Sequence, residues 1–130
     1  MEAQLTLLAK QAERAVRRRS RYYGPALTNR LLASIATLLN HEEFEGEIPD
    51  LRSLGPILRA AQIVGEANVS LGVSDTGHFT AIWNDENRTI YVEAISNFIV
   101  NWAIATESED SISTLSSEPS TLVEFSGALG

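Results

Sequence analysis

The stretch GHFTAIWNDENRTIYVEAISNFIVNWAI, residues 77–104, decides the fold of this 130-residue chain, and it holds both tryptophans and no proline. Within it, aromatic and β-branched residues recur at every second position in three runs, which is typical of β-strands. One face of these runs carries Phe79, Ala81, Trp83, Ile90, Val92, Phe98, Val100, Trp102 and Ile104. The polar segments 84–87 and 96–97 favour turns, because Asn and Asp side chains hydrogen-bond to local backbone. The stretch therefore predicts three antiparallel strands joined by two tight turns.

The opposite face of the predicted sheet is also partly apolar, since it carries Ile82, Tyr91, Ile95 and Ile99. A sheet that is apolar on both faces is covered on both. One layer of helices covers only one face, so the second face is expected to meet a second subunit or another protein. These four residues are therefore candidate binding residues. The aromatic residues Trp83, Trp102, Tyr91 and Phe98 are interpreted as core side chains, with a ligand pocket as the alternative.

The N-terminal half, residues 2–64, has the apolar spacing of amphipathic helices. It predicts helices over 2–22, 25–40 and 53–64. Gly24 and Pro25 separate the first two, and Ser53 is the expected N-cap of the third.

Alternating residues 69–73 predict a first strand ahead of the central stretch. Residues 106–120 are rich in Ser and acidic residues and predict a mobile loop. Leu122, Val123 and Phe125 then predict a last short edge strand.

Helices first and strands second indicate an α+β fold in a single domain, residues 1–130. About three N-terminal helices are expected to pack on a C-terminal antiparallel meander of four to five strands. The helical half is residues 2–64, and the sheet half is residues 68–126.

The net charge of −7 is unevenly distributed. Residues 1–60 carry nine basic and seven acidic residues, whereas residues 61–130 carry Arg88 alone against ten acidic residues. A general nucleic-acid binder is expected to be basic over its domain, so nucleic acid is not the favoured partner. The chain has no cysteine, which excludes disulfides and thiolate metal sites. No apolar run has the length of a membrane span or of a signal peptide, and a cytoplasmic location without membrane insertion is expected.

An arginine cluster at the end of the first predicted helix is the sharpest local feature: Arg14, Arg17, Arg18, Arg19 and Arg21. Cations near a helix C-terminus complement the helix dipole, but five in eight residues exceed that need. Three interpretations remain open: a solvated helix end, a contact with acidic groups of a protein partner, and a contact with phosphates.

No residue pattern predicts catalysis, a cofactor or a metal site. His41 lies in an acidic loop, but there is no second histidine at ligand spacing, so a solvated loop is favoured over a weak cation site. His78 has Asp75 near it in a turn, yet the chain has neither a nucleophile elbow nor a phosphate loop. A half-exposed strand histidine is the favoured interpretation.

Residues 65–104, with Gly77, Trp83 and the hairpin that follows, resemble small uncharacterised bacterial and mobile-element proteins. The resemblance implies a helical N-terminal half and an antiparallel meander, and it implies no activity. We expect a small, non-enzymatic binding or regulatory protein that acts by protein–protein association, antitoxin-like or immunity-like by analogy. The alternatives are a small-ligand binder or enzyme that uses the aromatic face of the sheet, and a nucleic-acid binder that uses the arginine-rich first helix.

Overall fold

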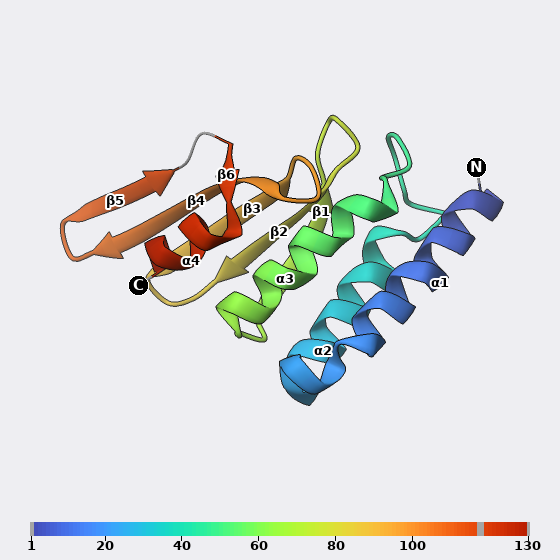
Figure 1. The fold of residues 1–130 in the computed structure, drawn as a ribbon, viewed down its shortest axis with the longest axis horizontal. Coiled ribbons are helices and arrows are strands. Elements are labelled where there is room, and N and C mark those ends of the chain that lie inside the picture. Colours follow the sequence, from blue (N-terminus) through green and yellow to red (C-terminus); the bar gives the residue numbers. More distant parts are fainter. Residues whose placement is uncertain (1, 117–118, 130) are drawn as a thin grey trace.

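Helices precede strands along most of the chain, and the fold is α+β, as the sequence predicts. The computed structural model describes residues 2–116 and 119–129. The elements are α1 (Glu2–Arg18), α2 (Ser20–Leu38), the short 3-10 helix η1 (Leu51–Ser53), α3 (Leu54–Val64), β1 (Val69–Val73), β2 (Phe79–Asn84), β3 (Arg88–Ala94), β4 (Ile99–Ser108), β5 (Ser111–Ser116), β6 (Ser120–Thr121) and α4 (Leu122–Leu129). Figure 1 shows α3 lying along the sheet, with α1 and α2 side by side next to it.

The sheet is an antiparallel meander in which β1 to β5 follow one another in chain order, while β6 continues beyond β5 along the same edge of β4. The predicted strand alternation is confirmed. Ala81, Trp83, Val92 and Trp102 belong to the buried face, where Trp83 lies opposite Ile90. Side chains from α3 and α4 complete this core.

The first two helices differ from the prediction at their junction. Instead of one helix over 2–22, α1 ends at Arg18, and Arg19 adopts a non-helical conformation before α2 begins. Gly24 interrupts α2 with φ 77° and ψ 167°, a backbone conformation that glycine adopts without steric cost. Pro25 then restarts the helix. The predicted break at residues 24–25 is therefore present, and a second break, which the sequence does not predict, lies before it at Arg19.

The outer edge of β1 is covered by α2. Arg30 donates a hydrogen bond from Nε to the carbonyl oxygen of Val69 at 3.0 Å, and the Ser34 hydroxyl donates to the same oxygen at 3.3 Å. An edge strand exposes unpaired backbone groups. Both side chains donate hydrogen bonds to one such group, the Val69 carbonyl. The helical pair α1–α2 is thereby attached beside the sheet, while α3 and α4 cover its buried face.

Ser53 is the residue before α3, but it does not cap that helix with its side chain. Its hydroxyl donates to the carbonyl oxygen of Asp50 at 2.7 Å and accepts from the backbone N–H of Phe79 at 2.9 Å. Ser53 therefore occupies the predicted N-cap position, but its side chain joins η1 to the first residue of β2 instead of capping α3.

The C-terminal region contains two departures from the prediction. Residues 106–116 form a hairpin, in which Ser108 lies opposite Ser111, rather than a loop without regular structure. Their mobility stays a prediction, and residues 117–118 of the predicted loop lie outside the described residues. The predicted edge strand at Leu122, Val123 and Phe125 is wrong, because these residues form α4.

A side-chain N-cap favours α4 as a helix. The Thr121 hydroxyl oxygen accepts from the backbone N–H of Glu124 at 3.3 Å, which is one half of a capping box. The Glu124 carboxylate accepts from the Ser120 hydroxyl at 2.7 Å, in place of the backbone N–H that a full capping box uses. One turn later, Phe125 packs against the Trp102 ring of β4 with ring centroids 6.1 Å apart. Among the residues that the structure describes, no helix combines the length and the apolar character that crossing a membrane requires.

Candidate functional site

The five clustered arginines lie where α1 passes into α2, and we call this surface the arginine corner (Arg14, Arg17, Arg18, Arg19 and Arg21). All are exposed except Arg19, which is half-buried. Within the described part of the chain, none of them forms an ion pair with an acidic side chain. Arg21 donates to the Tyr22 hydroxyl at 2.7 Å and lies over its ring at 4.8 Å from the centroid. The corner is thus a surface of uncompensated positive charge.

A hollow of about 510 Å³ lies beside the arginine corner. Its charged wall is formed by Arg18, Arg19 and Arg52, and its apolar part by side chains of α1, η1 and α3 that include Ala15 and Leu58. Arg52 is itself paired with Asp50, with Nη2 and Oδ2 2.9 Å apart. Hydrogen bonds from the Arg52 side chain and backbone lower the pKa of Asp50, so this carboxylate stays ionised and neutralises Arg52. Arg18 and Arg19 supply the free charge.

Tyr23 connects the arginine corner to α3. Its hydroxyl donates to the carbonyl oxygen of Leu58 at 3.2 Å. Burial raises the pKa of Tyr23 to about 12, and the positive charge of Arg19 opposes that change only in part. The folded state therefore favours the neutral, protonated form of the Tyr23 phenol.

Tyr23 makes stability depend on alkaline pH. Between the ordinary pKa of 10.0 and the folded-state value of about 12, the unfolded chain releases the Tyr23 proton and the folded chain keeps it. The free energy of unfolding is therefore expected to fall as pH rises through this window, and to fall less steeply in Tyr23→Phe. Urea unfolding of both proteins across the window measures the difference. If the free energy of unfolding fell with pH equally steeply in both proteins, the raised pKa of Tyr23 would be contradicted.

The open face of the sheet carries the second predicted set, Ile82, Tyr91, Ile95 and Ile99. Ile82 lies directly opposite Tyr91, and the Ile95 N–H donates to the Ile99 carbonyl at 2.9 Å, so the structure brings these residues together in two pairs. Ile82 is 38% exposed and the other three are half-buried.

A polar row separates the two apolar pairs. Thr80 lies opposite Glu93, which in turn lies opposite Asn101, and all three share the open face with Ile82. The face is therefore mixed rather than continuously apolar, because a polar row across the strands alternates with apolar residues along them. The expectation that this face meets a second subunit stays a prediction.

The aromatic residues are divided between core and surface. Trp83 and Trp102 are buried, which confirms their assignment to the core, and Tyr91 is half-buried on the open face. Phe98 was assigned to the core and is 77% exposed, because it lies in the turn before β4 rather than in the strand. Both indoles therefore belong to the packed core.

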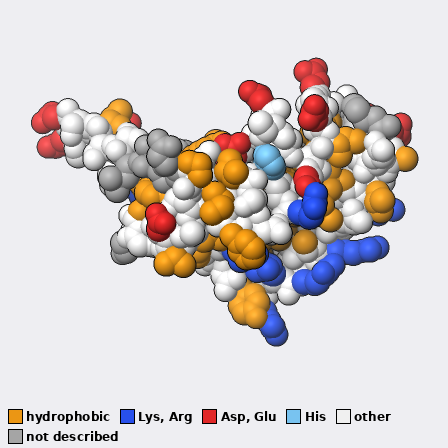
Figure 2. All heavy atoms as spheres, turned by 45° about the horizontal axis from the view of Figure 1, so that its top comes forward, with side chains coloured by type: hydrophobic (Ala, Val, Ile, Leu, Met, Phe, Trp, Pro, Cys, Tyr) orange, Lys and Arg blue, Asp and Glu red, His pale blue; other side chains and the backbone are white. Residues whose placement is uncertain are grey.

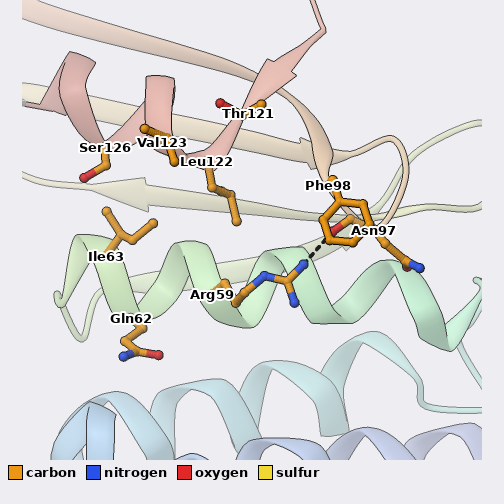
Figure 3. A pocket seen from close by; sticks show the side chains of 9 residues that line it. All are labelled: Arg59, Gln62, Ile63, Asn97, Phe98, Thr121, Leu122, Val123 and Ser126. Atoms are coloured by element: carbon orange, nitrogen blue, oxygen red, sulfur yellow. Dashed lines mark hydrogen bonds between the residues drawn. The ribbon is translucent and has the colours of Figure 1, made fainter.

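A groove of about 760 Å³ lies between α3 and α4, and we call it the α3–α4 groove (Figure 3). Its walls are Arg59, Gln62 and Ile63 from α3, Asn97 and Phe98 from the β3–β4 turn, and Thr121, Leu122, Val123 and Ser126 from β6 and α4. Val123 is 82% exposed. The sequence does not predict this site, because the groove forms only where α4 is a helix beside α3.

The charged side chains are segregated on the surface. On the face drawn in Figure 2, Lys and Arg lie over the lower right part, while most Asp and Glu lie along the top and the left.

The two histidines do not join a larger cluster of metal-ligating side chains among the described residues. His41 Nε2 lies 3.5 Å from the Glu2 carboxylate, and His78 Nδ1 lies 2.8 Å from the Thr76 hydroxyl. Within residues 2–116 and 119–129, no three His, Asp or Glu side chains are grouped as metal ligands.

Comparison with protein-family models, with curated proteins and with solved structures finds no match to this chain. The resemblance of residues 65–104 to small bacterial and mobile-element proteins stays an expectation.

Proposed function

We propose that this chain is a small non-enzymatic binding protein that associates with an acidic surface of another protein through the arginine corner. One observation carries the proposal: five arginines gather within eight residues, and no described acidic side chain pairs with any of them. Exposed charges contribute little to the stability of a fold. Such a surface is therefore better explained by binding than by folding.

The chemistry of arginine favours carboxylates as the complementary groups. Each guanidinium offers a planar fork of N–H donors that grips a carboxylate through two parallel hydrogen bonds. The hollow beside Arg18 and Arg19 adds an apolar floor that includes Leu54 and Leu58. An acidic segment of a protein that also carries an apolar side chain matches both properties.

Nucleic acid is the less favoured partner because of the charge on the rest of the molecule. A polynucleotide extends its phosphates well beyond one corner, whereas residues 61–130 carry ten acidic residues against one basic residue. These acids repel a long polyanion, but a short acidic protein segment contacts the corner alone.

The class of protein follows by analogy. A small acidic chain that acts by association alone suits a regulatory or neutralising partner, antitoxin-like or immunity-like. A cytoplasmic location is part of the same proposal.

Replacement of Arg17, Arg18 and Arg21 by alanine tests the arginine corner. Because each exposed ion pair contributes up to about 1 kcal/mol, the loss of three is expected to weaken partner binding by about tenfold or more. The melting temperature is expected to stay close to that of the wild type. Affinity is measured by titration with the protein that the wild-type chain retains from nuclease-treated extract of its native host.

The matched control replaces the same three residues by lysine. This variant keeps the positive charge and loses the guanidinium forks, so it is expected to bind with an intermediate affinity. If nuclease treatment removed the partner, and if the alanine variant lost a sequence-selective nucleic-acid complex that persists at physiological salt, the nucleic-acid interpretation would replace this one.

A further inference from the structure

From the α3–α4 groove we infer a second binding site, which is separate from the arginine corner. We propose that it binds a small monocarboxylate with an unbranched apolar tail, with the carboxylate at Arg59 and the tail between α3 and α4. The site is independent of the proposed protein association, because none of its lining residues belongs to the arginine corner.

Most of the exposed surface that lines the groove is apolar, although five of its nine side chains are polar or charged. Phe98 and Val123 are 77% and 82% exposed, and Ile63 and Leu122 also line the groove. Exposed large apolar side chains that converge on one groove typically mark a binding site rather than ordinary surface. An apolar ligand segment gains free energy by removing this surface from water.

Arg59 is the single formally charged side chain among the nine that line the groove. It donates from Nη2 to the carbonyl oxygen of Asn97 at 2.5 Å, which holds the guanidinium at the end of the groove beside the β3–β4 turn. Among the described residues this is its single hydrogen bond, and no acidic side chain pairs with it. Its remaining N–H groups can donate to a carboxylate, and the lack of acids in the wall favours an anionic head over a cationic one.

Figure 3 shows how these parts are placed. The Arg59 guanidinium and Asn97 lie at the Phe98 end of the groove, whereas Ile63 of α3 and Val123 of α4 face each other toward the other end. The charged end, which also carries Phe98, is thus separated from a mainly apolar end, where Ile63 and Val123 lie beside Ser126. A head-and-tail ligand is complementary to that arrangement, while a uniformly polar ligand leaves the apolar end in contact with water.

The size of the groove favours a small molecule. Ligand pockets typically have volumes of about 300–1,000 Å³ and combine mostly apolar walls with a few polar groups that fix orientation. The α3–α4 groove, at about 760 Å³, falls within that range. Gln62, Thr121 and Ser126 are further polar side chains among its lining residues.

Calorimetric titration with decanoate tests the proposal, using decyltrimethylammonium as a probe of the same tail length and opposite charge. The full-length protein is expected to bind one decanoate, and to bind the cation at least about tenfold more weakly. Arg59→Gln is expected to weaken decanoate binding by about tenfold or more, because it removes a charge-assisted hydrogen bond. Val123→Asp is expected to weaken it to a similar extent by placing a carboxylate beside the tail.

Two controls separate the site from the rest of the surface. Leu7→Asp introduces the same charge at an exposed apolar residue outside the groove. Leu7 lies on α1 and is 57% exposed, and this variant is expected to bind decanoate as the wild type does. The triple alanine variant of the arginine corner is also expected to bind decanoate normally, even if the proposed protein association fails.

Four results would overturn the proposal. They are no measurable decanoate binding below its micelle concentration, equal binding of the anion and the cation, unchanged decanoate binding in Val123→Asp, and loss of the protein partner in Val123→Asp. The last result would assign the groove to the protein interface.

Discussion

Phe125→Ala is expected to lower the free energy of unfolding by about 3–5 kcal/mol, which is the usual cost of truncating a buried Phe. Phe125 is fully buried, and its ring packs against Trp102 of β4. It is the buried anchor of α4, an element of eight residues. A helix this short is unstable without tertiary packing, so α4 is expected to detach when the ring is removed.

Urea unfolding measures this effect, and Val123→Ala is the matched control on the same helix. Val123 is 82% exposed, so its truncation is expected to change stability by less than about 0.5 kcal/mol. Similar losses from both substitutions would show that α4 does not dock through Phe125. Loss of decanoate binding in Phe125→Ala is expected as well, because α4 forms one wall of the α3–α4 groove.

Ser53→Ala is expected to cost about 1–3 kcal/mol, although it removes a single oxygen atom. The Ser53 hydroxyl is the acceptor for the buried N–H of Phe79. Alanine leaves that donor without a partner in the core, and an unpaired buried donor carries its full desolvation cost. The carbonyl of Asp50 keeps a second donor, the Ser53 backbone N–H at 3.0 Å, so the loss is confined to Phe79.

Thermal and urea unfolding of Ser53→Ala measure the cost, with Ser126→Ala as the control. Ser126 is exposed on α4, and its truncation is expected to be nearly neutral. Hydrogen exchange at the Phe79 amide gives a local readout, since that amide is expected to exchange faster in Ser53→Ala. A stability equal to that of the wild type would mean that water replaces the hydroxyl.

The strands could be predicted because burial follows their alternation. Residues such as Trp83 and Val92 are apolar at every second position, and the observed register puts them on one buried face. Residues 106–116 were missed because their Ser-rich, acidic composition conceals the strand pairing of Thr106 with Ser113. The composition of a segment indicates how well water solvates it, whereas its pairing as a strand depends on the backbone of the neighbouring strand.

The error at α4 has a local cause. Leu122, Val123 and Phe125 form a short apolar segment that Glu124 interrupts, and so short a segment fits a strand or a helix equally well by periodicity. The capping pattern from Thr121 to Glu124 was the sequence signal that separates the two possibilities. The break at Arg19 has no comparable signal, since neither glycine nor proline is present there.

The arginine corner could be predicted as a cluster because its members are close in sequence, but the hollow beside it could not. The hollow joins α1 to residues of η1 and α3, such as Arg52 and Leu58. In the same way, the α3–α4 groove joins Arg59 to Asn97 and Val123, which are distant in the chain. Such contacts depend on packing between elements and leave no periodic trace in the sequence.

The meander order of the sheet has a consequence for folding kinetics. Each strand from β2 to β5 pairs with the strand just before it, so each of these pairings closes a short loop and can form as soon as both strands have been synthesised. Folding is fast when contacts are local in sequence. The strand β6 extends the β4–β5 pairing, because Ser120 and Thr121 lie opposite Val100 and Ile99, further along β4 than the residues that face β5. As the last part of the chain to be synthesised, β6 and α4 are therefore expected to dock last, on a sheet that is already assembled.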